Sequence, residues 1–218
     1  MVLEYCLLFA LRTGGRSSCG YIGKANSVNN KRFNLFHIIK EIMDTIECIK
    51  TRSSIRNYKS NPVPESIFQD ILNAGVHAPS AGDVQDWEFV VVRKPGIKKQ
   101  IAEAALGQDF VANAPVVIVV CSNLEKIERV YGERGVGLYS IQDTAAATEN
   151  MLLAAWERGI GSCWVGAFNE ERIKEILLIP TNVRPLAIVT MGYPQISFKK
   201  QKNRDLSMIL HWERWNGK

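Results

Sequence analysis

The chain has 218 residues, of which 46% are hydrophobic and 22% charged, so it is long enough for one domain with a substantial core. No run approaches the roughly 18 apolar residues of a membrane-spanning helix. The net charge of +5 is concentrated in residues 1–42, with six Lys or Arg against two Asp or Glu, whereas residues 43–218 carry 21 against 20. Bulk charge therefore gives no case for nucleic-acid binding.

Cysteines and histidines are spread along the chain without the spacing of metal ligands. The five cysteines form no C-x-x-C pair, and their odd number argues against a disulfide framework. His37, His77 and His211 are far apart in sequence, so we expect no metal site. The N-terminal apolar run carries Glu4, lacks a basic leading segment and shows no small-residue cleavage site, which argues against a signal peptide. A cytoplasmic protein is the resulting expectation.

Residues 1–42 differ in character from the rest of the chain. They contain paired glycines, serines and asparagines, and their single hydrophobic residues follow no sustained period. We expect either a poorly packed extension or a translation start placed upstream of the true one, because Met43 would be a natural start. Residues 43–218 are predicted to form one domain.

The first part of this domain mixes predicted helices with predicted strands. Residues 64–78 favour a helix that has Pro64 before its first turn and ends before Pro79. The elements expected next are a strand at 88–93, a short helix at 94–106, a fully buried strand at 115–122 and a broken helix with a loop at 123–135.

The best-defined predicted element is a helix over residues 138–158. Much of its surface is small or apolar, which is typical of a helix at the centre of a fold or in a subunit interface. Strands at 161–168 and 184–194 follow, with a helix at 169–179 between them. The positions that repeat in steps of three and four are Leu138, Ile141, Ala145, Thr148, Leu152 and Ala155.

The stretch TRSSIRNY, residues 51–58, places Arg52 and Arg56 on either side of Ser53 and Ser54. Arginine supplies forked, charged donors and serine supplies a short hydroxyl, so this grouping suits a phosphate. An ordinary solvated turn with a serine cap is the alternative. Spacing does not show whether the stretch meets a second basic cluster near the end of the chain, which contains Lys199, Lys200, Lys202 and Arg204.

Common nucleotide-binding and hydrolase motifs do not occur in the sequence. There is no G-x-x-x-x-G-K-[ST], and the glycines of GERGVG follow no predicted strand. There is also no G-x-S-x-G elbow and no carboxylate pair that would suit hydrolysis. If the protein is an enzyme, we expect its difficult chemistry to belong to a cofactor.

Several segments, taken together, resemble the FMN-dependent nitroreductase family of flavin oxidoreductases. They are RSSIRNY, APSAGDVQDWEFVVV, APVVIVVC, YGERGVGLYSIQDTAAATENMLLAAWERGIGSCWVGAF, PLAIVTMGYP and the basic KKQKNR, in the family's order and spacing. The resemblance runs from about Asp44 to Trp212 and leaves residues 1–42 outside. It implies an α+β fold with a central, mainly antiparallel sheet flanked by helices. It also implies a homodimer with FMN at the subunit interface, where the 138–158 helix would lie.

By this resemblance, the arginines and serines of the TRSSIRNY stretch would hold the phosphate and ribityl chain of FMN. Lys202 and Arg204 would close the phosphate site from the C-terminal side. The segment PSAGDVQ would come from the other subunit and lie along the flavin ring. In WVGA, the Gly166 backbone N–H would point at flavin N5 and that of Ala167 at O4. The residues implied to bind the cofactor are Arg52, Ser53, Ser54, Arg56, Pro79, Ser80, Ala81, Asp83, Gln85, Gln108, Val165, Gly166, Ala167, Lys202 and Arg204.

Two residues depart from the family pattern SAGNxQPW. Asp83 stands where the pattern has an amide, and Asp86 stands where it has a proline. An ionised Asp83 cannot donate a hydrogen bond, so it would either lower the flavin's potential or cap the next segment. Trp87 matches the family's tryptophan, and we expect it to pack in the core.

The resemblance implies an NAD(P)H oxidoreductase that alternates between two substrates. NADH or NADPH would pass hydride to flavin N5, and a small-molecule acceptor such as a nitroaromatic or quinone would then take the same place, with no side chain acting as nucleophile. Tyr131, within 124–137, is a candidate for a lid, although surface packing is the simpler interpretation. The alternatives are a specialised flavin reaction, such as reductive dehalogenation or flavin fragmentation, and a flavin-binding or redox-sensing module without turnover. Neither nucleic acid nor a membrane is an expected partner.

Overall fold

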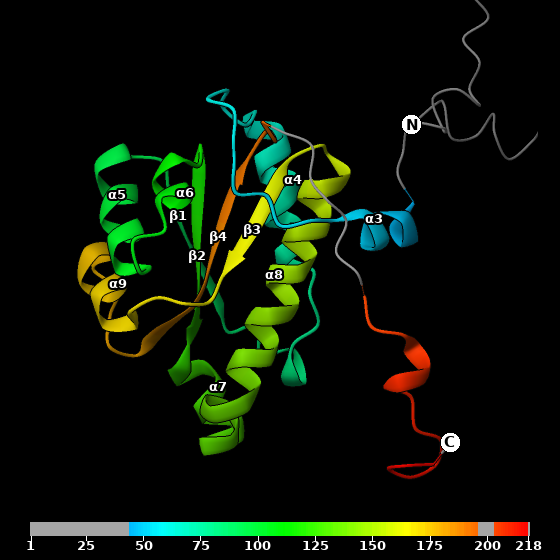
Figure 1. The fold of residues 1–218 in the computed structure, drawn as a ribbon. Helices are drawn as coiled ribbons and strands as arrows, with labels where there is room; N and C mark the ends of the chain where they lie inside the picture. Colours follow the sequence, from blue (N-terminus) through cyan, green and yellow to red (C-terminus); the bar gives the residue numbers. More distant parts are fainter. Residues whose placement is uncertain (1–43, 196–202, 218) are drawn as a thin grey trace, which may run out of the picture. The chain divides into compact units, whose positions relative to one another are not determined.

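The computed structural model describes residues 44–195 and 203–217, and its centre is one antiparallel sheet (Figure 1). The strand order is β1-β2-β4-β3, and every neighbouring pair is antiparallel. This confirms the predicted α+β fold with an antiparallel sheet. The strands are β1 (Trp87–Val92), β2 (Val116–Asn123), β3 (Gly161–Val165) and β4 (Val183–Gly192).

Helices cover both faces of the sheet (Figure 1). The burial pattern of β2 explains this arrangement. Its run VVIVVC is buried throughout, so alternate side chains enter two different cores. Val117 and Val119 pack on the side of α5 (Pro95–Ala104), α6 (Asp109–Asn113) and α9 (Glu170–Leu177). Ile118 and Val120 pack on the side of α4 (Glu65–Val76) and α8 (Ser140–Glu157).

The predicted break before the long helix is confirmed. Helix α7 (Leu124–Arg134) contains Gly132, whose φ of 55° and ψ of −144° interrupt the helix, and a π-helical turn, η2 (Gly135–Tyr139), leads into α8. Glycine alone adopts such a conformation without strain. Helix α8 therefore begins at Ser140 and ends at Glu157, slightly inside the predicted 138–158.

The predicted apolar face of α8 was only partly right. Thr148, Leu152 and Ala155 are buried, whereas Ile141 is 44% exposed and Ala145 is half-buried. The sheet-facing side of the first turns is polar instead, with Ser140, Asp143 and Thr144 all buried. Ranking residues by hydrophobicity therefore selected the wrong face in these turns.

Other boundaries differ from the expectations in small ways. Strand β3 ends at Val165 rather than 168, and α6 was not predicted. Helix α3 (Thr45–Thr51) buries Cys48, while Ile46 and Ile49 are exposed.

Among the described residues, no helix is long and apolar enough to cross a membrane. The remaining short elements are two 3₁₀ turns, η1 (Ala81–Asp83) and η3 (Leu206–Met208).

The stretch after α3 runs along the free edge of β3. Ser54 bridges Ser162 in parallel, and the Ile55 N–H donates to the Ser162 carbonyl at 2.8 Å. Further on, the Lys59 N–H donates to the Tyr193 carbonyl at 2.9 Å. These bonds satisfy part of an edge strand that would otherwise be open, and they fix the stretch against the sheet.

Gly161 makes this close approach possible. A Cβ at this position would lie 2.7 Å from Ile55 Cγ1 and 2.9 Å from Ile55 Cβ. We expect Gly161→Ala to lower the free energy of unfolding by about 1–3 kcal/mol, as other overpacked sites do. Urea unfolding at fixed protein concentration measures the change.

The control for this variant is Gly96→Ala in α5, where a Cβ would meet nothing within 4 Å. Alanine is the better helix former, so we expect unchanged or slightly higher stability, by up to about 1 kcal/mol. If Gly161→Ala were as stable as Gly96→Ala, the packing of the 52–58 stretch on β3 would be contradicted.

Candidate functional site

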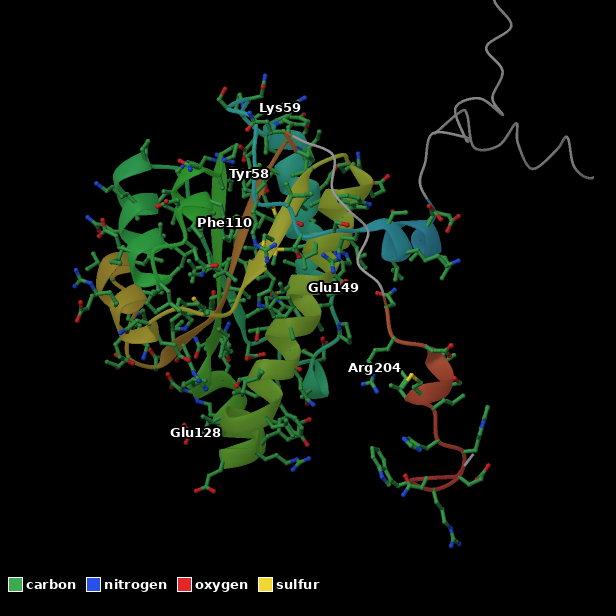
Figure 2. The ribbon with its side chains drawn as sticks, in the orientation of Figure 1. Tyr58, Lys59, Phe110, Glu128, Glu149 and Arg204 are labelled. Atoms are coloured by element: carbon green, nitrogen blue, oxygen red, sulfur yellow. The ribbon has the colours of Figure 1, made fainter. Side chains whose placement is uncertain are left out.

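The stretch with two arginines begins where α3 ends. Arg52 follows the last helical residue, and its Nε lies 3.7 Å from Glu149 Oε1 of α8, with 26% of the side chain exposed (Figure 2). The Ser53 hydroxyl donates to the Thr51 carbonyl at 3.4 Å, while Ser54 and Arg56 are exposed. A loose ion pair at this distance leaves most of the Arg52 donors free for another anion.

Arg52, Ser54 and Arg56 all influence the pKa of the thiol of Cys163 in β3. Burial raises the pKa of its thiol, and three groups oppose that rise: the charge of Arg56, a hydrogen bond with Ser54 and the charge of Arg52. Both guanidinium groups and the Ser54 hydroxyl therefore lie near enough to Cys163 to lower the pKa of its thiol. Such a concentration of positive charge and donors favours an anion.

A second group of residues adjoins the first. The Arg56 guanidinium lies 5.7 Å from the centre of the Phe110 ring. Two residues before that ring, Gln108 Nε2 donates to the Ala105 carbonyl at 2.8 Å and to the Ala167 carbonyl at 3.4 Å. Arg56 is thus connected through Phe110 and Gln108 to the segment that follows β3.

That segment is Val165, Gly166 and Ala167, the first buried and the other two exposed. A Cβ added to Gly166 would meet nothing within 4 Å, so the fold of the described chain does not itself require glycine here. Open space beside exposed backbone is what a planar ligand needs for close approach.

The segment from Pro79 to Gln85 is a tight loop attached to α8. The Ala81 N–H donates to both carboxyl oxygens of Asp143, at 3.0 and 3.1 Å, and the Gln85 N–H donates to Ser80 Oγ at 3.0 Å. Among the described residues, no hydrogen bond or ion pair joins this loop to the arginine stretch. Its contribution from a second subunit stays a prediction.

Asp83 does not cap the following segment. It has a φ of 57°, and its Oδ1 accepts a hydrogen bond from Gln85 Nε2 at 2.7 Å, which occupies part of the Gln85 amide predicted to bond near the flavin. Trp87 is buried in the core as expected.

Asp86 is the residue whose role sequence reasoning missed. It is fully buried, Ser122 Oγ donates to its Oδ2, and its Oδ1 has no hydrogen-bond partner. Asp143, 5% exposed, lies beside it. Burial, opposed by the Ala81 N–H and reinforced by Asp86, raises the pKa of Asp143 to about 6. The signal was present in the sequence, because Asp86 precedes a buried strand at a place where the family has proline.

The basic cluster near the end of the chain is only partly described. Lys199, Lys200 and Lys202 lie outside the described residues. Arg204 belongs to the described segment 203–217, where no hydrogen bond or ion pair connects it with Arg52 or Arg56 (Figure 2). Its predicted place in a phosphate site, like that of Lys202, stays a prediction.

Tyr131 packs on the loop rather than projecting freely. Its ring meets that of Tyr139 edge to face, with centroids 5.0 Å apart, and Arg134 Nε donates to the Tyr139 hydroxyl at 2.9 Å. A Cβ at Gly82 would overlap the Tyr131 hydroxyl. The segment predicted as a candidate lid therefore lies against the loop predicted to contact flavin.

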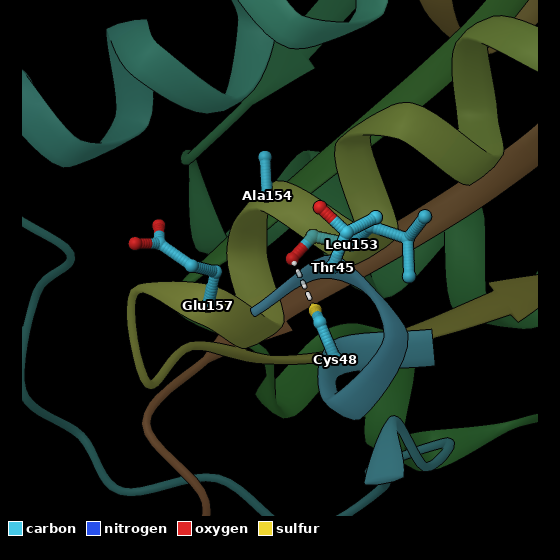
Figure 3. A pocket seen from close by; sticks show the side chains of 5 residues that line it. All are labelled: Thr45, Cys48, Leu153, Ala154 and Glu157. Atoms are coloured by element: carbon cyan, nitrogen blue, oxygen red, sulfur yellow. Dashed lines mark hydrogen bonds between the residues drawn. The ribbon is translucent and has the colours of Figure 1, made fainter. Parts of the chain in front are cut away.

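A cavity of about 200 Å³ lies between α3 and α8, lined by Thr45, Cys48, Leu153, Ala154 and Glu157 (Figure 3). Cys48 Sγ donates to the Leu153 carbonyl at 3.3 Å, and the pKa of this thiol is raised mainly by burial. The charged residue in the lining is an acid, so this cavity does not suit a phosphate. Across the described residues, no group of His, Cys, Asp and Glu side chains could hold a metal ion.

Comparison with known proteins places this chain in one family. The model of the nitroreductase family matches residues 49–108 and 105–193. The chain is 37% identical over 181 residues to a "Putative NADH dehydrogenase/NAD(P)H nitroreductase" of Methanothermobacter thermautotrophicus, covering 79% of this chain and 88% of that protein. It is 24% identical over 186 residues to the FMN reductase (NADPH) of Bacillus subtilis, covering 79% and 75%.

Solved structures agree on the fold. The NADPH:FMN oxidoreductase from Vibrio harveyi, in complex with NAD+, superposes with a TM-score of 0.73 over 79% of this chain and 78% of that one, at 23% identity. The chain therefore belongs to the nitroreductase family, as its motifs predicted.

The contact between Tyr131 and the loop gives a double-mutant prediction. Gly82 has a φ of 55°, so Gly82→Ala strains the backbone by about 1–2 kcal/mol and also displaces the Tyr131 hydroxyl. We expect Gly82→Ala to cost less in a Tyr131→Phe background than in the unchanged chain, as measured by urea unfolding. Equal costs in both backgrounds would contradict the packing of Tyr131 on the loop.

Proposed function

We propose that this chain is an FMN-dependent NAD(P)H oxidoreductase. The observation that carries the proposal is the pairing of residues 54 and 55 with Ser162, which lays the stretch that contains Arg52 and Arg56 along the β3 edge. Arg56 lies over Phe110, and Gln108 bonds the Ala167 carbonyl beside the open backbone of Gly166. A group with a phosphate at one end and a flat, reducible ring at the other fits this arrangement. The names of relatives, which include nitroreductases and FMN reductases, support the same cofactor and donor.

The residues present fit FMN in distinct ways. Arg52 and Arg56 supply charged donors for the phosphate, and Ser53 and Ser54 supply hydroxyl groups at the same edge. Val165, Gly166 and Ala167 would pass the flavin edge, where the exposed backbone can approach a ring without steric conflict. Lys202 and Arg204 would add positive charge from the C-terminal side.

When bound, FMN supplies reversible hydride and electron transfer between NADH or NADPH and an acceptor. The chain's own part is to bind, orient and tune the electrostatics, because positive charge and fixed N–H donors stabilise negative charge that develops on a reduced ring. We propose nitroaromatic or quinone-type acceptors, which would occupy in turn the place vacated by the nicotinamide.

We also propose that residues 43–218 form the flavin-binding domain and assemble as a homodimer in the cytoplasm. Helix α8 carries the exposed Ile141 and the half-buried Ala145, and α3 exposes Ile46 and Ile49. Apolar surface of this kind is typical of a subunit contact. A second subunit would bring its own Pro79–Gln85 loop to the flavin.

The visible spectrum of the purified protein tests the activity. We expect a yellow protein that NADH or NADPH bleaches and that a nitroaromatic or quinone reoxidises. Yellow protein inert to both nicotinamides would contradict an oxidoreductase and favour a flavin-binding module. Protein that remains colourless and does not take up added FMN would contradict the cofactor itself.

The arginines give a second test. We expect Arg52→Ala and Arg56→Ala each to weaken FMN binding by about 1.5–3 kcal/mol, the contribution of a charged hydrogen bond, with little loss of folding stability. Equilibrium binding followed by flavin fluorescence measures the effect. Arg129→Ala is the matched control, because Arg129 pairs with Glu125 on the exposed surface of α7. FMN affinity equal to that of the control would remove the arginines from the site.

A further inference from the structure

We propose that the carboxyl groups of Asp86 and Asp143 share one proton. The hydrogen bond that this proton forms joins the end of the loop from Ala81 to Asp86 to helix α8. The two carboxyl groups are then positioning residues for the loop. Their importance for flavin binding rests on the proposed function, whereas the shared proton does not.

Asp143 holds both ends of this loop. At one end its carboxyl group accepts the Ala81 N–H at 3.0 and 3.1 Å. At the other end it lies against the Asp86 side chain, where loop and β1 meet. A single side chain of α8 therefore contacts the loop at both of its ends.

The hydrogen bonds of the two carboxyl groups leave one buried oxygen without a donor, which a proton shared between the groups would supply. Asp86 Oδ2 accepts from Ser122 Oγ, and Asp143 accepts from Ala81. Asp86 Oδ1 is buried with no donor facing it. Among the described residues, neither Asp86 nor Asp143 forms an ion pair with a basic side chain, and two adjacent carboxylates buried without a cation would be very costly. One shared proton gives the unpaired oxygen a partner and leaves a single negative charge.

The pH dependence follows with a definite sign. Burial and the neighbouring Asp86 raise the pKa of Asp143 to about 6 in the folded chain, against about 3.9 for an unfolded Asp. The folded state therefore holds the proton more tightly. This contribution to stability is fully present below about pH 4 and is lost as pH rises through about 6. Above that range the two carboxylates repel each other at the base of the loop.

Asn substitutions distinguish a proton shared by two carboxyl groups from a single buried carboxyl group that titrates alone. In Asp86→Asn or Asp143→Asn, the amide can donate one N–H to the remaining carboxylate and still accept the Ser122 or Ala81 hydrogen bond, so it imitates the shared proton at every pH. We expect unfolding of the unchanged chain to become easier between pH 4 and 6 relative to either Asn variant. The ratio of unfolding equilibrium constants should change about tenfold for each unit of pKa difference.

The control is Glu128→Gln in α7, an exposed carboxylate that should leave the pH profile of the unchanged chain intact (Figure 2). NMR of the Ala81 amide supplies an independent readout, because its shift should titrate near pH 6 in the unchanged chain and not in Asp86→Asn. Parallel stability profiles for the unchanged chain and both Asn variants, with no titration of the Ala81 amide above about pH 5, would overturn the proposal.

FMN binding, measured separately, tests the role of the loop. Between pH 5 and 7, the affinity of the unchanged chain divided by that of Asp86→Asn should fall. Ionisation of the FMN phosphate is common to both proteins and cancels in this ratio. A flat ratio beside a titrating Ala81 amide would refute the positioning role for flavin and leave the shared proton standing. If neither protein bound FMN at any pH, the proposed function would fail, whatever the titration showed.

Discussion

The pairing of residues 54 and 55 with the free edge of β3 is the constraint on which the site depends. The Ile55 N–H bond to the Ser162 carbonyl holds an extended stretch against the sheet, with Arg52 before the paired residues and Arg56 directly after them. Without that pairing, Arg52 and Arg56 would be two solvated side chains in a loop. The sheet edge therefore turns a local sequence pattern into a site.

Helix α8 is the second organising element, because it holds two separate parts of the site. Glu149 meets Arg52, and Asp143 holds the Ala81 loop. These two acids are six positions apart, or about 9 Å along a helix, so the arginine stretch and the loop of one chain occupy different heights on α8. Within residues 44–195 and 203–217, no hydrogen bond or ion pair joins these two parts.

Much of this arrangement could be predicted from the sequence, since period and composition carry it. The buried run VVIVVC identified β2, and the glycine-rich break before α8 was visible in YGERGVG. The buried face of α8 near Asp143 was not predictable in this way. Polar residues occupy this face because they form hydrogen bonds there, and a search for periodic hydrophobic residues does not detect them. Asp86 was not predictable for the same reason: it is buried beside Asp143, which lies 57 positions later in the sequence.

The central claim is that the 52–56 stretch binds the phosphate of FMN, and comparison of FMN with riboflavin tests it most directly. Riboflavin has the same ring and ribityl chain but no phosphate, so the ratio of the two affinities isolates the phosphate's contribution. The account predicts that the unchanged chain strongly prefers FMN and that the preference falls by at least about tenfold in Arg52→Ala and Arg56→Ala, while riboflavin binding is unaltered. An FMN preference that survived both substitutions would place the phosphate elsewhere and contradict the account.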